Sequence, residues 1–134
     1  MAGFRPDEGK LVSGNLILKR TLSDRDADLE IGLFTDVAPA ATITEATITE
    51  PVGAGYARKT LTDASWAEAA EVFSYAAQTF TPTGGSWAGV QGYFISTKAS
   101  GGTQRLIAVE VDANGPYTIL DGNDYEITPQ ITML

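Results

Sequence analysis

Apolar and polar residues alternate with a period of two along most of this chain, a pattern typical of strands that bury one face. The alternation predicts strands at residues 16–22, 29–35, 46–50, 56–62, 72–81, 89–97, 105–111, 117–120 and 124–133. Turns rich in Gly, Asn, Asp and Ser separate the later ones, at residues 81–86, 99–103, 112–116 and 121–124. Short strands at this spacing predict an all-β fold: a single-domain antiparallel sandwich or jelly roll of about 8–9 strands, with at most one or two short helical turns.

The apolar positions of these strands also predict the core. The residues expected there are Ile17, Ile31, Leu33, Phe73, Phe94, Ile107, Val109, Ile119 and Ile127.

Two stretches are ambiguous. Residues 6–15 begin with Pro, Asp and Glu, which signal a helix start, but two glycines weaken the helix, so 1–15 is expected to be an N-terminal arm or short helix. In residues 65–78, Ser65 and Glu68 form a capping box, whereas Phe73 and Tyr75 alternate as in a strand. We expect a short helical turn over 65–70 followed by a strand, with a full helix as the alternative.

A long connector of Ala, Thr, Pro, Gly and Glu separates the expected strands 29–35 and 56–62. It contains no His, no Cys, no phosphate-binding loop and no basic cluster. Long ordered loops usually contact something, so we interpret it as a surface that meets a partner, with a mobile surface loop as the alternative.

Composition excludes several function classes. The chain of 134 residues has no Cys and no His, which removes disulfides, thiolate metal sites and the commonest general base. Seventeen acidic against nine basic residues give a net charge of −8, which disfavours binding to nucleic acid. No apolar run approaches the roughly 20 residues of a membrane span, and the charged N-terminus lacks an apolar signal core. We therefore expect no nucleic-acid partner, no membrane and no targeting segment.

No motif for catalysis stands out, and the sequence predicts no enzyme, no catalytic residue and no cofactor. Asp24, Asp26 and Asp28 have the spacing of a calcium loop, but Leu29 stands where its glycine belongs and Thr35 where its final glutamate belongs. A solvated acidic turn is favoured there, so no metal site is predicted.

The two tryptophans are candidates for an oligomer or ligand surface. Trp66 and Trp87, with nearby tyrosines, could form a platform that stacks on sugars. Packing in the core or at an interface is the alternative.

A series of short motifs occurs in a fixed order. It consists of "LFTD" with a Pro three residues on, "GYARKTLT" followed by Trp66, "QTFTPTG", "GVQGYFIST", "RLIAVEV" and "GNDYEITPQITML". The series resembles a family of small virion proteins of tailed bacteriophages, over residues from about 7 to 134. Some members, in phages of cyanobacteria, are similar to capsid cement (decoration) proteins that form trimeric jelly-roll knobs on the head.

The resemblance implies a viral structural protein without catalytic residues, made in the host cytoplasm and located on the outer surface of the phage head. Its partners would be the major capsid protein and itself, as a homotrimer. The Ile/Thr-rich segment and the C-terminal "QITML" also favour assembly, because exposed strand edges are usually covered. The alternative is a tail or fibre module that binds a host-surface carbohydrate through Trp66 and Trp87.

Cations are scarce in this chain, so they are the candidates for contact with an acidic shell. We place the expected capsid contact on Phe4 and Arg5 and on the pair Arg58 and Lys59. The alternative is that Arg58 and Lys59 alternate on a solvated strand.

Overall fold

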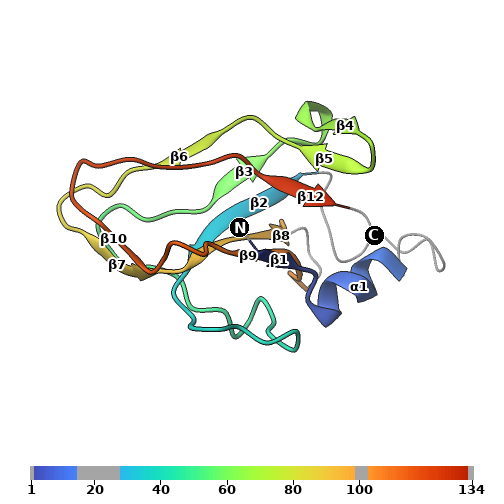
Figure 1. Cartoon of the computed structure of the whole chain (residues 1–134), viewed down its shortest axis with the longest axis horizontal. Helices are drawn as coiled ribbons and strands as arrows, with labels where there is room; N and C mark the ends of the chain where they lie inside the picture. The colour runs from blue at the N-terminus through green and yellow to red at the C-terminus, as the bar shows by residue number, and fades with distance from the viewer. Residues whose placement is uncertain (1, 15–27, 99–102, 133–134) are drawn as a thin grey trace.

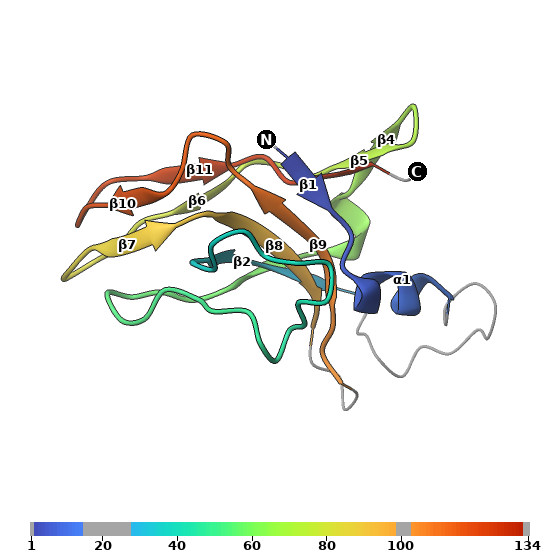
Figure 2. The same ribbon diagram turned by 60° about the horizontal axis from the view of Figure 1, so that its bottom comes forward.

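The computed structural model describes residues 2–14, 28–98 and 103–132, and shows antiparallel strands stacked in two layers (Figures 1 and 2). The first layer is a five-stranded sheet in the order β1-β9-β8-β2-β3. Its strands are β1 (Ala2–Phe4), β2 (Leu29–Phe34), β3 (Lys59–Leu61), β8 (Gly92–Thr97) and β9 (Leu106–Val111). The predicted all-β sandwich is confirmed.

The second layer is built from shorter pieces. β12 (Gln130–Thr132), β5 (Val72–Ser74) and β4 (Ala67–Ala69) form a three-stranded sheet in that order, and β6 (Gln78–Phe80) pairs with β11 (Tyr125–Ile127). β7 (Trp87–Val90) pairs with β10 (Tyr117–Ile119) and runs on toward β8, so it links the two layers. Three of the long strands expected from alternation are therefore each divided in two.

The main core lies between the layers. It consists of the buried residues Ile31, Leu33, Leu61, Phe80, Trp87, Val90, Tyr93, Ile95, Ile119 and Ile127. A second cluster lies on the opposite face of the five-stranded sheet and consists of Phe34, Phe94, Leu106 and Val109. Both faces of β8 are thus covered, which explains why all six of its residues are buried.

Most of the residues predicted to form the core are buried. Ile31, Leu33, Phe94, Val109, Ile119 and Ile127 are buried, and Ile107 is partly buried against the main core. The prediction that Phe73 lies in the core was wrong: its side chain is 37% exposed, because the β4–β5 hairpin that carries it lies at one end of the molecule (Figure 1). Ile17 and the expected strand 16–22 lie outside the described residues.

The N-terminal segment forms a strand and a short helix, α1 (Asp7–Gly14), as one of the two expectations for residues 1–15 had it. α1 packs closely on β9 at Gly9, where a β-carbon would lie 2.7 Å from the Ile107 carbonyl oxygen. Glycine is therefore needed at this contact. In the part of the chain that the structure describes, no helix has the length and apolar character to cross a membrane.

The prediction of a helical turn over 65–70 was wrong. A 3-10 turn, η2 (Asp63–Ser65), comes earlier, and β4 then pairs with β5. The β4–β5 hairpin turns through Ala70 and Glu71, which both have positive φ, 51° and 66°. Such a turn requires φ > 0 at both central residues and is favoured by Asn-Gly.

Replacing Ala70 and Glu71 together with Asn and Gly is expected to stabilise the protein. The double variant relieves two strained residues, each costing about 1 kcal/mol, so the free energy of unfolding should rise by about 1–2 kcal/mol. Urea unfolding measures the gain. Placing the same Asn and Gly at Ala113 and Asn114, neither of which has positive φ, is the control and should give no gain. A double variant no more stable than the wild type would contradict the assigned turn.

Candidate functional site

The connector between β2 and β3 is ordered and lies on the sheet of its own chain (Figure 2). Ile43 and Ile48 pack against the second core cluster, beside Phe4 and Val111. The connector thus covers the face of β8 and β9 that the second layer does not cover. Part of its length is explained by this internal packing.

Hydrogen bonds fix the connector at its neck and against α1. Thr49 donates its backbone N–H to Asp36 Oδ2 at 2.7 Å, and Thr35 donates its own to the Thr49 carbonyl at 2.9 Å. Glu8 Oε1 accepts from the backbone N–H of Glu45, at 2.6 Å, and from that of Leu106 in β9. One carboxylate therefore joins the helix, the connector and the sheet.

The prediction of a strand at 46–50 was wrong. In the structure Thr44 donates its N–H to the Thr47 hydroxyl at 3.0 Å, and the Ile48 N–H reaches the Thr44 carbonyl at 2.9 Å. Threonine hydroxyls can bond to nearby backbone groups and so stabilise turns as well as strands. The alternating Thr and Ile of this segment form such a turn.

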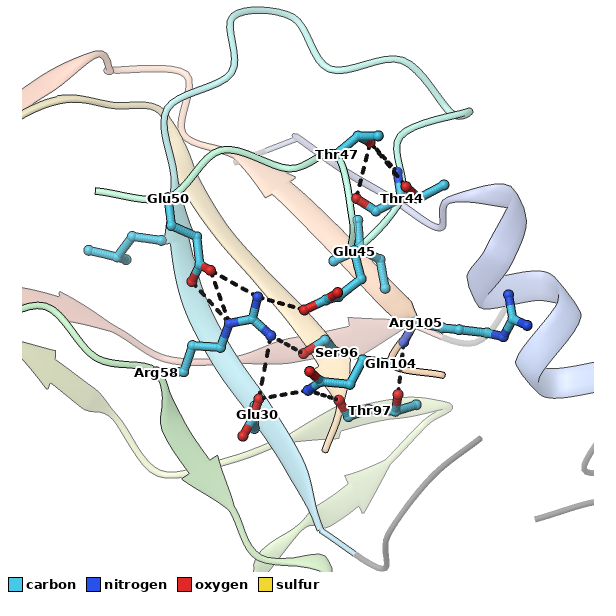
Figure 3. Close-up of polar contacts among 12 residues, drawn as sticks. Glu30, Thr44, Glu45, Thr47, Glu50, Arg58, Ser96, Thr97, Gln104 and Arg105 are labelled. Atoms are coloured by element: carbon cyan, nitrogen blue, oxygen red, sulfur yellow. Dashed lines mark hydrogen bonds and ion pairs between the residues drawn. The ribbon is translucent and has the colours of Figure 1, made fainter. Parts of the chain in front are cut away.

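Arg58 is the centre of a polar cluster that holds the connector to the sheet (Figure 3). Its guanidinium binds Glu50 through two nitrogens, Nε to Oε1 at 3.0 Å and Nη2 to Oε2 at 2.9 Å. It also pairs with Glu45 at 2.8 Å and with Glu30 of β2 at 3.4 Å. The Arg58 side chain is only 18% exposed and lies 5.0 Å above the Phe94 ring.

The charge of Arg58 is paired with glutamates of its own chain. Burial opposes the charged guanidinium, but the hydrogen bonds to Glu50 and Glu45 outweigh it and raise the pKa of Arg58 above its ordinary value. The neighbouring Lys59 extends to the other face, with its Nζ 5.3 Å from the Phe80 ring. Arg58 and Lys59 therefore do not form a common basic spot.

The other two candidates for capsid contact lie on the opposite edge of the five-stranded sheet. Phe4 is half-buried against the second core cluster. Arg5 follows β1, and its Nη2 donates to the Gly9 carbonyl at 3.1 Å within α1. The sheet thus separates Phe4 and Arg5 from Lys59, and the four candidates do not form one surface.

The tryptophans do not form a paired platform. Trp87 is 2% exposed, lies edge-on to Tyr56, and its Nε1 donates to the Gly53 carbonyl at 3.0 Å. Trp66 is half-buried and lies edge-on to Tyr75. Trp87 therefore packs in the core, which was the alternative to a sugar-binding platform.

Replacing Trp87 with Phe is expected to lower the free energy of unfolding by about 1–2 kcal/mol, because the bond to Gly53 is lost and the core loses volume. Urea unfolding gives the value. Trp66→Phe is the matched control and should cost less than about 0.5 kcal/mol, since Phe keeps the ring contact with Tyr75. Equal losses in the two variants would contradict a structural role specific to Trp87.

A groove runs between the edge of the five-stranded sheet and β12. It has a volume of about 400 Å³ and is lined by residues 3–5, 108–110 and 130–132. Two of the lining residues bond to the buried Tyr93, whose hydroxyl donates to Glu110 Oε2 at 3.1 Å and accepts from the Gln130 N–H at 3.3 Å. The groove was not predicted from the sequence, because its walls come from three segments far apart in the chain.

Burial raises the pKa of Tyr93 well above its ordinary value, and it does the same for Tyr56 and Tyr125. An unfolded tyrosine loses its proton near the ordinary pKa of 10.0, whereas a buried one keeps it. Stability contributed by the protonated, buried form is therefore complete below pH 10 and is lost as the pH rises above it. Above that pH, each of these tyrosines lowers the free energy of unfolding by up to about 1.4 kcal/mol per pH unit.

Tyr93→Phe is expected to make the loss of stability above pH 10 shallower than in the wild type. At neutral pH the same variant should be less stable by about 1 kcal/mol, because two hydrogen bonds are lost. Urea unfolding from pH 8 to about pH 11 gives both values. The control is Tyr75→Phe. Hydrogen bonding to Thr62 lowers the pKa of Tyr75, so this variant should not make the loss of stability above pH 10 shallower. Parallel alkaline slopes for Tyr93→Phe and the wild type would contradict the assignment.

The acidic calcium-like segment is only partly described. Asp28 Oδ1 accepts the Asp63 backbone N–H at 3.1 Å, and Asp24 and Asp26 lie outside the described residues. Among residues 2–14, 28–98 and 103–132, no group of three or more acidic side chains is arranged to hold a metal ion.

The motif series quoted from the sequence maps mainly onto the cores. Buried members of the motifs include Leu33, Phe34, Leu61, Phe80, Val90, Tyr93, Phe94, Ile95, Leu106, Val109 and Ile127. The motifs are therefore determinants of the fold more than of a chemical site. Comparison of the chain with protein-family models, with curated proteins and with solved structures finds no match.

Proposed function

We propose that the protein is a non-enzymatic structural protein of a tailed-phage virion, a cement (decoration) protein that binds the outside of the major capsid protein shell. The observation that carries the proposal is the ordered motif series, from "LFTD" to "GNDYEITPQITML". Because its buried members determine the fold, proteins that share the series would share this sandwich, in the form of a jelly-roll knob.

The described surface supports a role in binding rather than in chemistry. Its most organised polar cluster, around Arg58, is used to hold the connector on the sheet. A connector fixed in this way presents one shape, and a preformed surface loses less conformational entropy when it meets a partner. Such a surface suits a protein that has to remain attached to a shell.

In the proposed mechanism, three copies act together. Packaged DNA pushes outward on the shell, and a homotrimer seated where capsomers meet would resist their separation. Each contact can be weak, because linkage of three copies raises the effective concentration of the second and third contacts. Light scattering at micromolar concentration should give the mass of a trimer, and a monomer would contradict this mechanism.

The function is tested by mixing the purified protein with expanded heads that lack it and sedimenting the mixture. The expected result is that the protein sediments with the heads and raises the temperature at which they open. Heads already saturated with their own decoration protein are the control and should bind none. Failure to bind, or binding without added heat resistance, would contradict the proposal and favour a tail or fibre module.

A further inference from the structure

The groove beside β12 lies where the second layer of the sandwich stops short of the first. β1 is the outermost strand of the five-stranded sheet, and β12 is the outermost strand of the three-stranded sheet. The groove is lined by residues of both strands and of β9. Among the described strands, β1 pairs with β9 alone and β12 pairs with β5 alone.

The edge of β12 that faces the groove offers backbone hydrogen-bonding groups. The Gln130 N–H donates to the Tyr93 hydroxyl rather than to β5, so it points toward the groove. In an antiparallel pair, alternate residues direct their backbone groups to the same side. The N–H and C=O of Thr132 therefore face the same edge as the N–H of Gln130.

The lining of the groove includes one acidic side chain, Glu110. Gly3 pairs with Glu110, and the Glu110 carboxylate lies over it: a β-carbon at Gly3 would lie 3.0 Å from Glu110 Oε2. Glu110 is half-buried and accepts one hydrogen bond, from Tyr93, and it forms no ion pair with any residue that the structure describes. The nearest cation in the lining, Arg5, is directed toward α1, where it binds the Gly9 carbonyl.

We infer that this groove accepts an extended segment of a partner protein, which pairs its backbone with β12 and places a Lys or Arg side chain on Glu110. Strand addition to a free sheet edge takes its affinity from main-chain hydrogen bonds and its specificity from pockets for alternate side chains. Three residues on each wall match about 10 Å of extended chain. The net charge of −8 favours a cationic segment over an acidic one. This binding site is separate from the proposed function, and it can be tested without phage heads.

The test uses two blocked pentapeptides, Thr-Val-Lys-Val-Thr and Thr-Val-Glu-Val-Thr, titrated into the full-length ¹⁵N-labelled protein and followed by NMR. The lysine peptide should shift the backbone amide signals of Gly3, Glu110 and Thr132. The glutamate peptide should bind at least about tenfold more weakly, the factor expected for one favourable charge pair. Glu110→Gln should weaken the lysine peptide by a similar factor, whereas the exposed control Glu126→Gln should not.

A second pair of variants tests the location. Gly3→Trp places a large side chain beside Glu110, because a β-carbon at Gly3 would lie 3.0 Å from Glu110 Oε2, and it should abolish the shifts at Glu110 and Thr132. Thr118→Trp, on the exposed face of β10, should leave them unchanged. The inference is overturned if the lysine peptide causes no shift at these amides up to about 5 mM, or if Gly3→Trp binds as the wild type does. It is also overturned if the same signals shift with protein concentration alone, because the occupant would then be a second copy of this chain.

Discussion

Replacing Arg58 with Met is expected to lower the free energy of unfolding by about 3 kcal/mol, the low end of the cost of breaking a buried ion pair. The melting temperature should fall by roughly 10 °C for a chain of this size. Three carboxylates converge on this one guanidinium, at 2.8 to 3.4 Å, and the side chain is 18% exposed. Without it, three half-buried negative charges remain close together with no cation between them.

Arg58→Lys is the matched control for this prediction. Lysine keeps the charge but cannot reproduce the two-nitrogen contact with Glu50. Arg58→Lys should therefore lower the free energy of unfolding by about half as much as Arg58→Met does. Urea unfolding measures the loss, and hydrogen exchange at the connector amides should accelerate in both variants. An Arg58→Met protein within about 0.5 kcal/mol of the wild type would show that the cluster does not hold the connector.

Gly92→Ala is expected to prevent folding or to cost more than about 4 kcal/mol, an exceptional value for a single substitution. A β-carbon at Gly92 would overlap the carbonyl oxygen of Glu110 in the paired strand β9, and it would lie 3.1 Å from the Asp112 nitrogen. Both are backbone atoms in the centre of the molecule and cannot turn aside as a flexible side chain would. The expected result is an insoluble protein, or a circular dichroism spectrum without the β signal.

Gly85→Ala is the control for Gly92→Ala. A β-carbon at Gly85 meets only the Ala54 side chain, at 3.4 Å, and Gly85 lies in a turn. Its stability should stay within about 0.5 kcal/mol of the wild type. If Gly92→Ala folds as well as Gly85→Ala does, the close approach of β8 and β9 at this position is wrong.

The alternation of apolar residues predicted the fold where one physical rule was enough. β2 and β9 were expected as strands because residues such as Ile31 and Val109 recur with period two, and the structure buries both. The same rule failed where side chains had a second use. Thr44 and Thr47 have strand propensity, but their hydroxyls bond to each other and to nearby backbone, and they form a turn instead.

The polar sites were harder to predict, because they depend on contacts between distant segments. Arg58 meets Glu50 eight residues away but Glu30 across 28 residues, and nothing in the local sequence marks the second contact. Glu8 reaches the Leu106 N–H across 98 residues. The groove depends on β1, β9 and β12 meeting at one edge, which only the strand order reveals.

The central claim is that the protein is a cement on the phage head, and an image of the intact virion tests it most directly. If the proposal holds, electron microscopy of virions that contain the chain, at a resolution that shows strands, should reveal this sandwich outside the shell, in groups of three where capsomers meet. Density for the sandwich on the tail or its fibres, or a shell without it, would contradict the claim.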